Sequence, residues 1–140
     1  MATATLSKEM LEAHPWPVKF DRNLLARCID ECLACVQSCT ACADASLAED
    51  DVVELRTCIT RCVDCADVCV ATARLLSRQT EFVAALARAQ VASCWEQCAL
   101  CARECERHAD HHKHCRICAE QCRRCEEACA AVLEAIGQSA

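Results

Sequence analysis

Apolar positions recur along this chain in the rhythm of an α-helix, and the most regular of them are cysteines. In the stretch CIDECLACVQSCTAC, residues 28–42, the cysteines follow one another at alternating steps of four and three residues. Such steps average about 3.5 residues, so the repeated positions lie on one face of a helix. The same spacing returns in three later segments. The pattern therefore predicts helices near residues 21–46, 51–77, 80–108 and 112–136.

The repeated positions hold all eighteen cysteines of the chain, in four groups. Four independent repeats of one spacing make the helical prediction specific. In chain order the four groups of cysteines are Cys28, Cys32, Cys35, Cys39, Cys42; Cys58, Cys62, Cys65, Cys69; Cys94, Cys98, Cys101, Cys105; and Cys115, Cys118, Cys122, Cys125, Cys129.

Residues at the helix boundaries agree with this prediction. Asp21 is a candidate N-cap for the first helix, and Asp51 with Glu54 forms a capping signature ahead of the second. We expect Thr80 to open the third helix and Gly137, the single glycine of the chain, to lie just past the fourth.

These helices predict an all-α fold. One glycine and no tyrosine argue against strands and their turns. Short connections make sequence neighbours antiparallel, which gives an up-down-up-down four-helix bundle with a cysteine-lined core. We expect residues 21–140 to form this single domain and residues 1–20 to form a short, loosely helical N-terminal arm on its outside.

Charge and hydropathy limit the partners and the compartment. The net charge of -6 gives no reason to expect nucleic acid. No stretch approaches the about 18 consecutive apolar residues of a membrane span. The N-terminal segment MATATLSKEMLEAHPWPVKF has no apolar run typical of an export signal. We therefore expect a cytoplasmic protein with reduced thiols, a setting in which many cysteines usually indicate metal.

Three functions without metal fit the cysteines poorly. A core of small side chains should underfill the space between helices about 8–10 Å apart. Thiols on one helix face the same way, so disulfides between them would be strained. A redox enzyme needs one reactive thiol set apart from the others, and here the CxxC steps lie inside the repeated ladder.

Among thiolate-binding metals, Cu(I) fits the ladder best. Iron–sulfur clusters and Zn(II) use isolated sets of four ligands, whereas helix-borne thiols should supply pairs more readily than converging fours. If each thiolate bridges two Cu(I), about one ion per cysteine leaves a nearly neutral core. The sequence thus favours a Cu(I) store over an enzyme. The alternatives are a store of zinc or another soft metal on the same fold, and a thiol-based redox protein.

The two ends of the predicted bundle differ in chemistry. Beyond the outermost cysteines at one end, the repeat continues into hydrocarbon side chains that would close the bundle: Leu25, Leu76, Val91, Val132 and Ile136, with Thr72 as an alternative to Leu76. At the other end it continues into His108, His111 and His112, and reaches Ser46, Leu55 and Asp51. Imidazole binds copper, so these histidines predict an open mouth, with His114 beside it.

On these residues the chain resembles the bacterial copper storage proteins, specifically their cytosolic branch. The resemblance covers residues 21–136, with four CxxxCxxC-type helices and a mouth that contains histidines. It implies a homotetramer of four-helix bundles that holds many Cu(I) ions and protects against copper toxicity, with a copper chaperone as a further candidate partner. It assigns all eighteen cysteines as metal ligands and His108, His111 and His112 to the open end.

Overall fold

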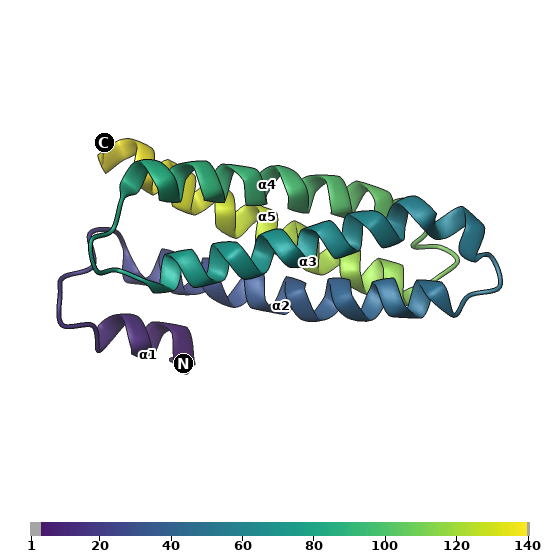
Figure 1. Cartoon of the computed structure of the whole chain (residues 1–140), viewed down its shortest axis with the longest axis horizontal. Helices are drawn as coiled ribbons and strands as arrows, with labels where there is room; N and C mark the ends of the chain where they lie inside the picture. The colour runs from purple at the N-terminus through teal and green to yellow at the C-terminus, as the bar shows by residue number, and fades with distance from the viewer. Residues whose placement is uncertain (1–3, 140) are drawn as a thin grey trace.

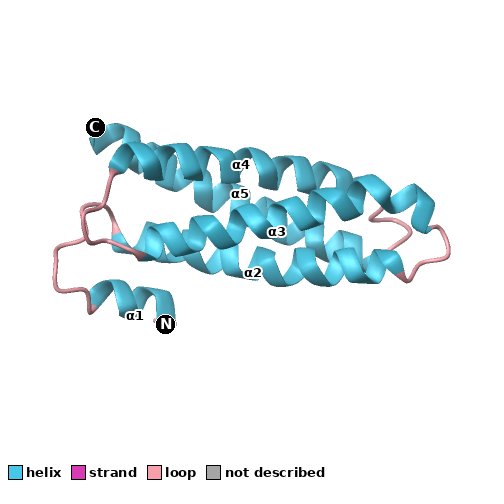
Figure 2. Cartoon of the chain, viewed as in Figure 1, coloured by secondary structure: helices cyan, strands magenta, loops and turns pink. Residues whose placement is uncertain are grey.

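Helices account for most of residues 4–139, the part of the chain that the structure, a computed structural model, describes. Short loops join the helices, and this part contains no strand (Figure 2). In chain order the elements are α1 (Leu6–Glu12), α2 (Arg22–Leu47), the 3-10 helix η1 (Val52–Leu55), α3 (Arg56–Ser77), α4 (Ala84–Arg107) and α5 (Lys113–Ser139). The predicted all-α fold is confirmed.

Helices α2 to α5 form a four-helix bundle (Figure 1). Helix α2 packs against α3 and α5, and α4 packs against the same two helices. The sulfur contacts fix the directions. Cys28 near the start of α2 lies 3.8 Å from Cys129 near the end of α5, whereas Cys42 near the end of α2 lies 3.9 Å from Cys115 near the start of α5. Helices α3 and α4 run antiparallel in the same way. Helices α2 and α4 run parallel, because Cys32 contacts Cys94 and Cys39 contacts Cys101, so the up-down-up-down arrangement holds.

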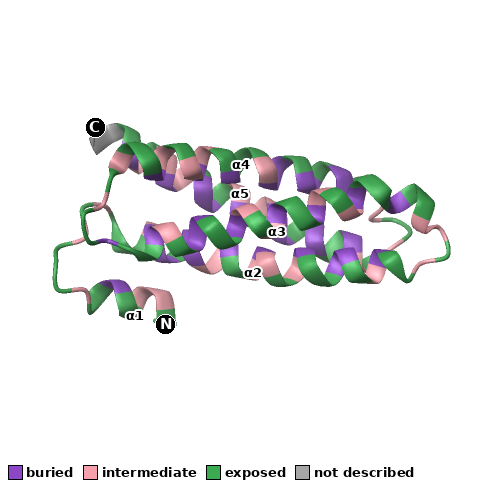
Figure 3. Cartoon of the chain, in the orientation of Figure 1, coloured by how far each residue is buried: buried purple, intermediate pink, exposed green. Residues whose placement is uncertain are grey.

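The core of this bundle consists largely of sulfur. All eighteen cysteines are buried, with at most 1% of each exposed. Buried residues follow the inward faces of the four long helices (Figure 3). The repeated spacing therefore places its cysteines on the interior face of each helix, as predicted.

One predicted helix cap is confirmed and another is wrong. The Asp21 carboxylate accepts hydrogen bonds from the backbone N–H groups of Asn23, at 2.8 Å, and Leu24, at 3.2 Å. Asp51 makes no such bond, and η1 intervenes before α3 begins at Arg56. The Asp51 carboxylate instead lies 3.0 Å from the Nε2 atom of His112, which is in the loop between α4 and α5. The Asp51 side chain, which the capping signature predicts as a helix cap, instead makes this tertiary contact.

The expected boundaries at Thr80 and Gly137 are also wrong. Helix α4 begins at Ala84, because Glu81 has a φ of 57°, a left-handed conformation that a right-handed helix cannot contain. Gly137 lies inside α5 and has no positive φ, so the helix continues through it.

The N-terminal segment packs on the outside of the bundle. Helix α1 contacts α2 and α3, and Leu11 on its inner face is buried. The Ser7 hydroxyl donates a hydrogen bond to the Asp30 carboxylate at 2.6 Å. Within residues 4–139, no helix combines the length and apolar character that crossing a bilayer requires.

Candidate metal centre

The thiols form a continuous array of sulfur contacts. Neighbouring Sγ atoms lie 3.6 to 4.0 Å apart, except that Cys35 Sγ makes its 3.7 Å contact with the Gln121 carbonyl, and all eighteen cysteines are free thiols. Cys39, for example, lies 3.6 Å from Cys118, 3.8 Å from Cys122 and 3.9 Å from Cys101. Because the sulfurs touch one another, the expectation that small side chains leave the core underfilled is wrong.

The thiols also converge in fours, contrary to our expectation for helix-borne ligands. Sets of four with all their Sγ atoms within 4.8 Å of one another include Cys32, Cys69, Cys94, Cys125; Cys35, Cys65, Cys69, Cys98; Cys39, Cys101, Cys118, Cys122; Cys42, Cys58, Cys62, Cys105; and Cys62, Cys101, Cys105, Cys118. They converge because side chains from facing helices meet at one level of the bundle. Several cysteines belong to two sets, so the sites overlap along the axis.

Hydrogen bonds between thiols move their pKa values in opposite directions. The neighbours Cys101 and Cys118, together with burial, raise the pKa of Cys122. Cys101 and Cys105 lower the pKa of Cys118, because their thiols donate to its thiolate. Each thiolate is thus stabilised by neighbours that keep their protons. Ionising the whole array requires cations among the sulfurs, because buried charges must be paired.

Hydrocarbon closes one end of the array, as predicted. Five apolar residues, each at most 1% exposed, lie beyond the last cysteines: Leu25, Leu76, Val91, Val132 and Ile136. Thr72 is buried beside them, and its hydroxyl donates to the Val68 carbonyl at 2.8 Å and accepts from Gln90 at 3.0 Å.

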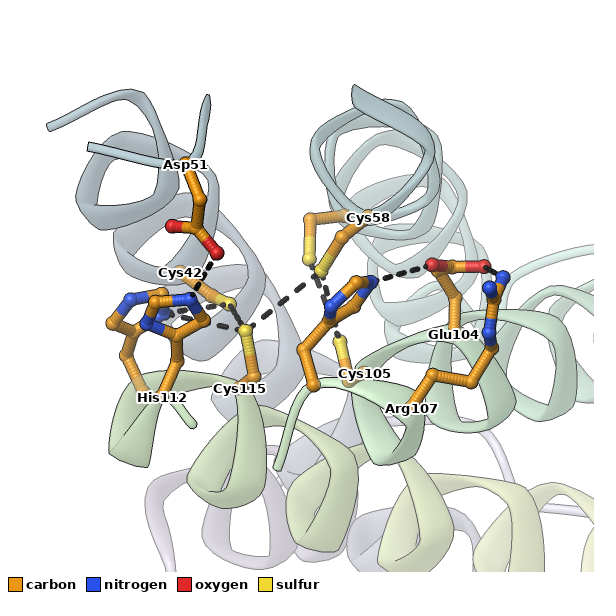
Figure 4. Close-up of polar contacts among 11 residues, drawn as sticks. Cys42, Asp51, Cys58, Glu104, Cys105, Arg107, His112 and Cys115 are labelled. Atoms are coloured by element: carbon orange, nitrogen blue, oxygen red, sulfur yellow. Dashed lines mark hydrogen bonds and ion pairs between the residues drawn. The ribbon is translucent and has the colours of Figure 1, made fainter. Parts of the chain in front are cut away.

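At the other end, His112 is held between two carboxylates. Its Nε2 atom lies 3.0 Å from Asp51 Oδ2, and its Nδ1 atom lies 2.7 Å from Glu49 Oε2. Asp51 raises the pKa of His112, and His112 in turn lowers the pKa of Asp51. Figure 4 shows Asp51 and His112 beside Cys42 and Cys115.

The histidine that reaches the sulfurs is His114. Its Nδ1 atom lies 3.4 Å from Cys42 Sγ and 3.5 Å from Cys115 Sγ, and its Nε2 atom lies 2.8 Å from Glu49 Oε2. Burial lowers the pKa of His114, but hydrogen bonds to Cys42 and Glu49 outweigh burial and raise it. The sequence placed His114 beside the mouth and not in the principal set. Its position directly before Cys115 was the available signal.

The other two predicted histidines lie in different settings. His108 is largely buried, and its Nε2 atom lies 2.9 Å from Oε2 of Glu104, a buried carboxylate that also pairs with Arg107 at 3.0 Å. Figure 4 shows Glu104 and Arg107 on the side of Cys58 and Cys105. His111 is exposed, and within residues 4–139 its ring makes no hydrogen bond or ion pair.

Two buried residues complete this end of the bundle. Ser46 and Leu55 are fully buried, as their place in the repeat indicated. The Ser46 hydroxyl lies one helical turn beyond Cys42 and has no hydrogen-bond partner in the described part of the chain. The mouth therefore combines sulfur, imidazole and carboxylate donors.

Comparisons with known proteins agree with this geometry. A family model described as copper storage protein matches residues 21–134. The copper storage protein Ccsp of Streptomyces lividans, in a structure loaded with 10 copper equivalents, is 50% identical with a TM-score of 0.91, over 92% of this chain and 98% of that one. A single-histidine-to-alanine mutant of Ccsp is 53% identical with a TM-score of 0.83, over 84% and 98%.

A third similar structure is that of a cytosolic copper storage protein from Streptomyces lividans with five coppers. It is 54% identical, with a TM-score of 0.80, over 80% of this chain and 93% of that one. No functionally curated protein matches the chain significantly. The family model covers most of the chain, and the residues that it matches include all eighteen cysteines. The chain is therefore a member of the copper storage protein family.

Proposed function

We propose that this chain is a cytosolic store of Cu(I), held by the thiolates inside the bundle, and that it protects the cell from free copper. One observation carries the proposal: eighteen buried, unpaired thiols form one continuous array. The Streptomyces lividans relative is described as loaded with 10 copper equivalents and as cytosolic. Half of the residues compared are identical, which supports the same role here.

Charge favours copper over zinc. Sulfur distances alone do not separate the metals, since a tetrahedral site with Zn–S bonds of about 2.3 Å needs sulfurs about 3.8 Å apart, close to the spacing observed. A filled set of isolated zinc sites, each with four thiolates, would bury two negative charges at each ion. Overlapping sets of thiols suit bridging thiolates instead. Cu(I) matched one to one with bridging thiolates leaves the core near neutrality.

A thiol-based redox protein is less well supported. A reactive thiol must be accessible and distinguished from its neighbours by a lowered pKa. Here every cysteine is at most 1% exposed, and lowered and raised pKa values occur throughout the array. We therefore propose storage without catalysis.

All eighteen cysteines are the proposed copper ligands, and the mouth histidines are proposed to pass Cu(I) between solvent and the first thiolates. His112 and His108 keep this role from the sequence prediction, and His114 joins them because its ring contacts Cys42 and Cys115. The role of His111 stays a prediction. Its exposed ring would act at the outer rim.

An anaerobic titration tests the storage function. Reduced apoprotein titrated with Cu(I) against a strong chelator should bind about one ion per cysteine, on the order of 18 per chain. A parallel titration with Zn(II) should saturate at a much lower stoichiometry. Saturation after only a few Cu(I) per chain would contradict the filled array, and a higher zinc than copper stoichiometry would favour the zinc store.

Copper loading should release protons. The neighbour Cys125 raises the pKa of Cys98, and Cys101 raises that of Cys122, so these thiols are protonated at neutral pH. Copper displaces their protons, and affinity should therefore fall as pH falls. We expect about one proton per Cu(I), averaged over full loading of a bridged array. A pH-stat during loading measures this ratio, and about two protons per ion would indicate isolated two-thiolate sites.

Substitution of the mouth histidines should slow copper exchange. The double variant His108→Ala and His114→Ala removes imidazoles but no thiol, so capacity should stay unchanged while uptake slows at least several-fold. Stopped-flow uptake measured by the copper–thiolate absorption checks this expectation. The matched control is His14→Ala, because His14 contacts Thr80 outside the mouth. Equal rates in all three proteins would remove His108 and His114 from the route.

We also propose that the chain assembles into a homotetramer, as the family resemblance implies. Exposed apolar side chains lie on the outer faces of α2 and α3, with Leu33 49% exposed, Val63 48% and Val70 38%. Leu33 lines a surface hollow together with Ala73 of α3, so the two helices share this face. Exposed apolar side chains of this kind support contact with another copy.

A further inference from the structure

The carboxylates at the mouth belong to a second arrangement that the thiol array does not need. Glu49 Oε2 lies 2.7 Å from His112 Nδ1 and 2.8 Å from His114 Nε2. One oxygen thus faces nitrogen atoms of two different imidazoles. The Glu49 side chain is 32% exposed, so water reaches this point.

Both rings are fixed by contacts on their other nitrogen atoms. Asp51 lies 3.0 Å from His112 Nε2, and Cys42 Sγ lies 3.4 Å from His114 Nδ1. The rings stack with centroids 5.4 Å apart and planes 22° apart. A carboxylate on the outer nitrogen of a histidine is the usual support for a metal ligand, because it fixes the tautomer and makes the inner nitrogen more basic. Asp51 has that position relative to His112.

The donor set selects a different ion from the thiolates. Two imidazoles and one carboxylate suit borderline divalent cations, typically Zn(II), whereas Cu(I) prefers sulfur. Bonds of about 2.0–2.1 Å to a tetrahedral ion place ligand atoms roughly 3.3 Å apart, so Glu49 Oε2 would retreat by about half an ångström. A water molecule would complete the coordination. The two negative charges of Glu49 and Asp51 offset the two positive charges of a divalent ion.

We propose that Glu49, His112 and His114 bind one divalent cation of the Zn(II) class at the mouth, with Asp51 as a residue that positions His112. The site rests on the proposed function in one respect, namely that Cu(I) occupies the thiols behind it. A bound ion engages His114, whose other nitrogen contacts Cys42. Occupancy of the site therefore slows exchange of stored copper.

Cobalt(II) is the probe, because its absorption reports sulfur ligands separately from nitrogen and oxygen ligands. Copper-loaded protein is incubated with Co(II), desalted and analysed for both metals. We expect one Co(II) per chain, without the intense sulfur-to-cobalt charge-transfer band. Glu49→Gln and His114→Gln should each weaken binding at least tenfold, and Asp51→Asn about 10–100-fold. The matched control Glu54→Gln changes an exposed carboxylate of η1 and should leave binding unchanged.

Three results would overturn the site: no Co(II) retained, equal retention by wild type and Glu49→Gln, or a strong sulfur-to-cobalt band. Copper analysis of the same samples separates this failure from failure of the store. Full copper loading without Glu49-dependent cobalt overturns only the divalent site. If the protein takes up only a few Cu(I) but still retains cobalt in a Glu49-dependent way, the divalent site stands and copper storage is overturned. Circular dichroism of each variant confirms that the bundle remains folded.

Discussion

Loading with Cu(I) is expected to raise the melting temperature by more than about 20 °C while leaving the helix content almost unchanged. The outer positions of the helices are rich in helix formers, so the helices should form before metal binds, and sulfurs from facing helices lie 3.6 to 4.0 Å apart. Copper then links thiols that come from different helices. An ion at 1,000 times its Kd stabilises the folded state by about 4 kcal/mol, and a domain of this size gains about 3 °C per kcal/mol. Even a few ions therefore exceed ordinary marginal stability.

Thermal melts followed by far-ultraviolet circular dichroism, before and after loading, measure both quantities. The control is loaded protein stripped by a chelator under reducing conditions, which should return to the melting temperature of the apoprotein. Copper bound by cysteines of the unfolded chain would reduce the shift. An apoprotein that is a random coil and folds only on loading would contradict a preformed bundle.

The interior of this protein could be predicted from sequence because one local rule determines it. Steps of four and three residues keep a side chain on one helix face wherever the helix lies, so burial of Cys28 and of Cys129 followed from spacing alone. The convergence of thiols in fours did not follow. It depends on the level at which facing helices meet, as where Cys39 of α2 comes within 3.6 Å of Cys118 of α5.

The mouth could be predicted only in part, because its contacts join segments far apart in the chain. Asp51 looks like a helix cap in sequence but pairs with His112, 61 residues away. The heptad register that selected His111 was extended through a loop between α4 and α5, where helical periodicity no longer applies. His111 is consequently exposed, whereas His114, in the first turn of α5, reaches Cys42. Beyond the ends of the helices the register no longer decides the outcome: extended past α4 it led to His112, which lies at the mouth, whereas the extension to His111 failed.

Copper that enters at the mouth must move from thiol to thiol to reach the closed end. The quartet Cys39, Cys101, Cys118 and Cys122 lies between the mouth and the closed end. Serine in all four positions removes the ligands and keeps side-chain volume nearly constant. The new hydroxyls have a ready partner, because Thr72 and Ser77 of this chain already donate to the carbonyl four residues earlier, at 2.8 and 2.7 Å. The quadruple variant should therefore fold.

This variant should lose about four Cu(I) at equilibrium and fill in two phases, because it removes the soft ligands of α2, α4 and α5 at this level and leaves only the α3 thiols Cys62 and Cys65 to carry copper past it. Thiols on the mouth side should load at the wild-type rate, and those beyond the quartet at least tenfold more slowly. A matched control removes four thiols at the closed end, where no ion has to pass: Cys28, Cys32, Cys125 and Cys129 replaced by serine. It should lose the same number of ions and keep single-phase filling. Stopped-flow uptake compares the two variants. Equal rates would mean that copper reaches the core between the helices, and that the sulfur array holds copper without conducting it.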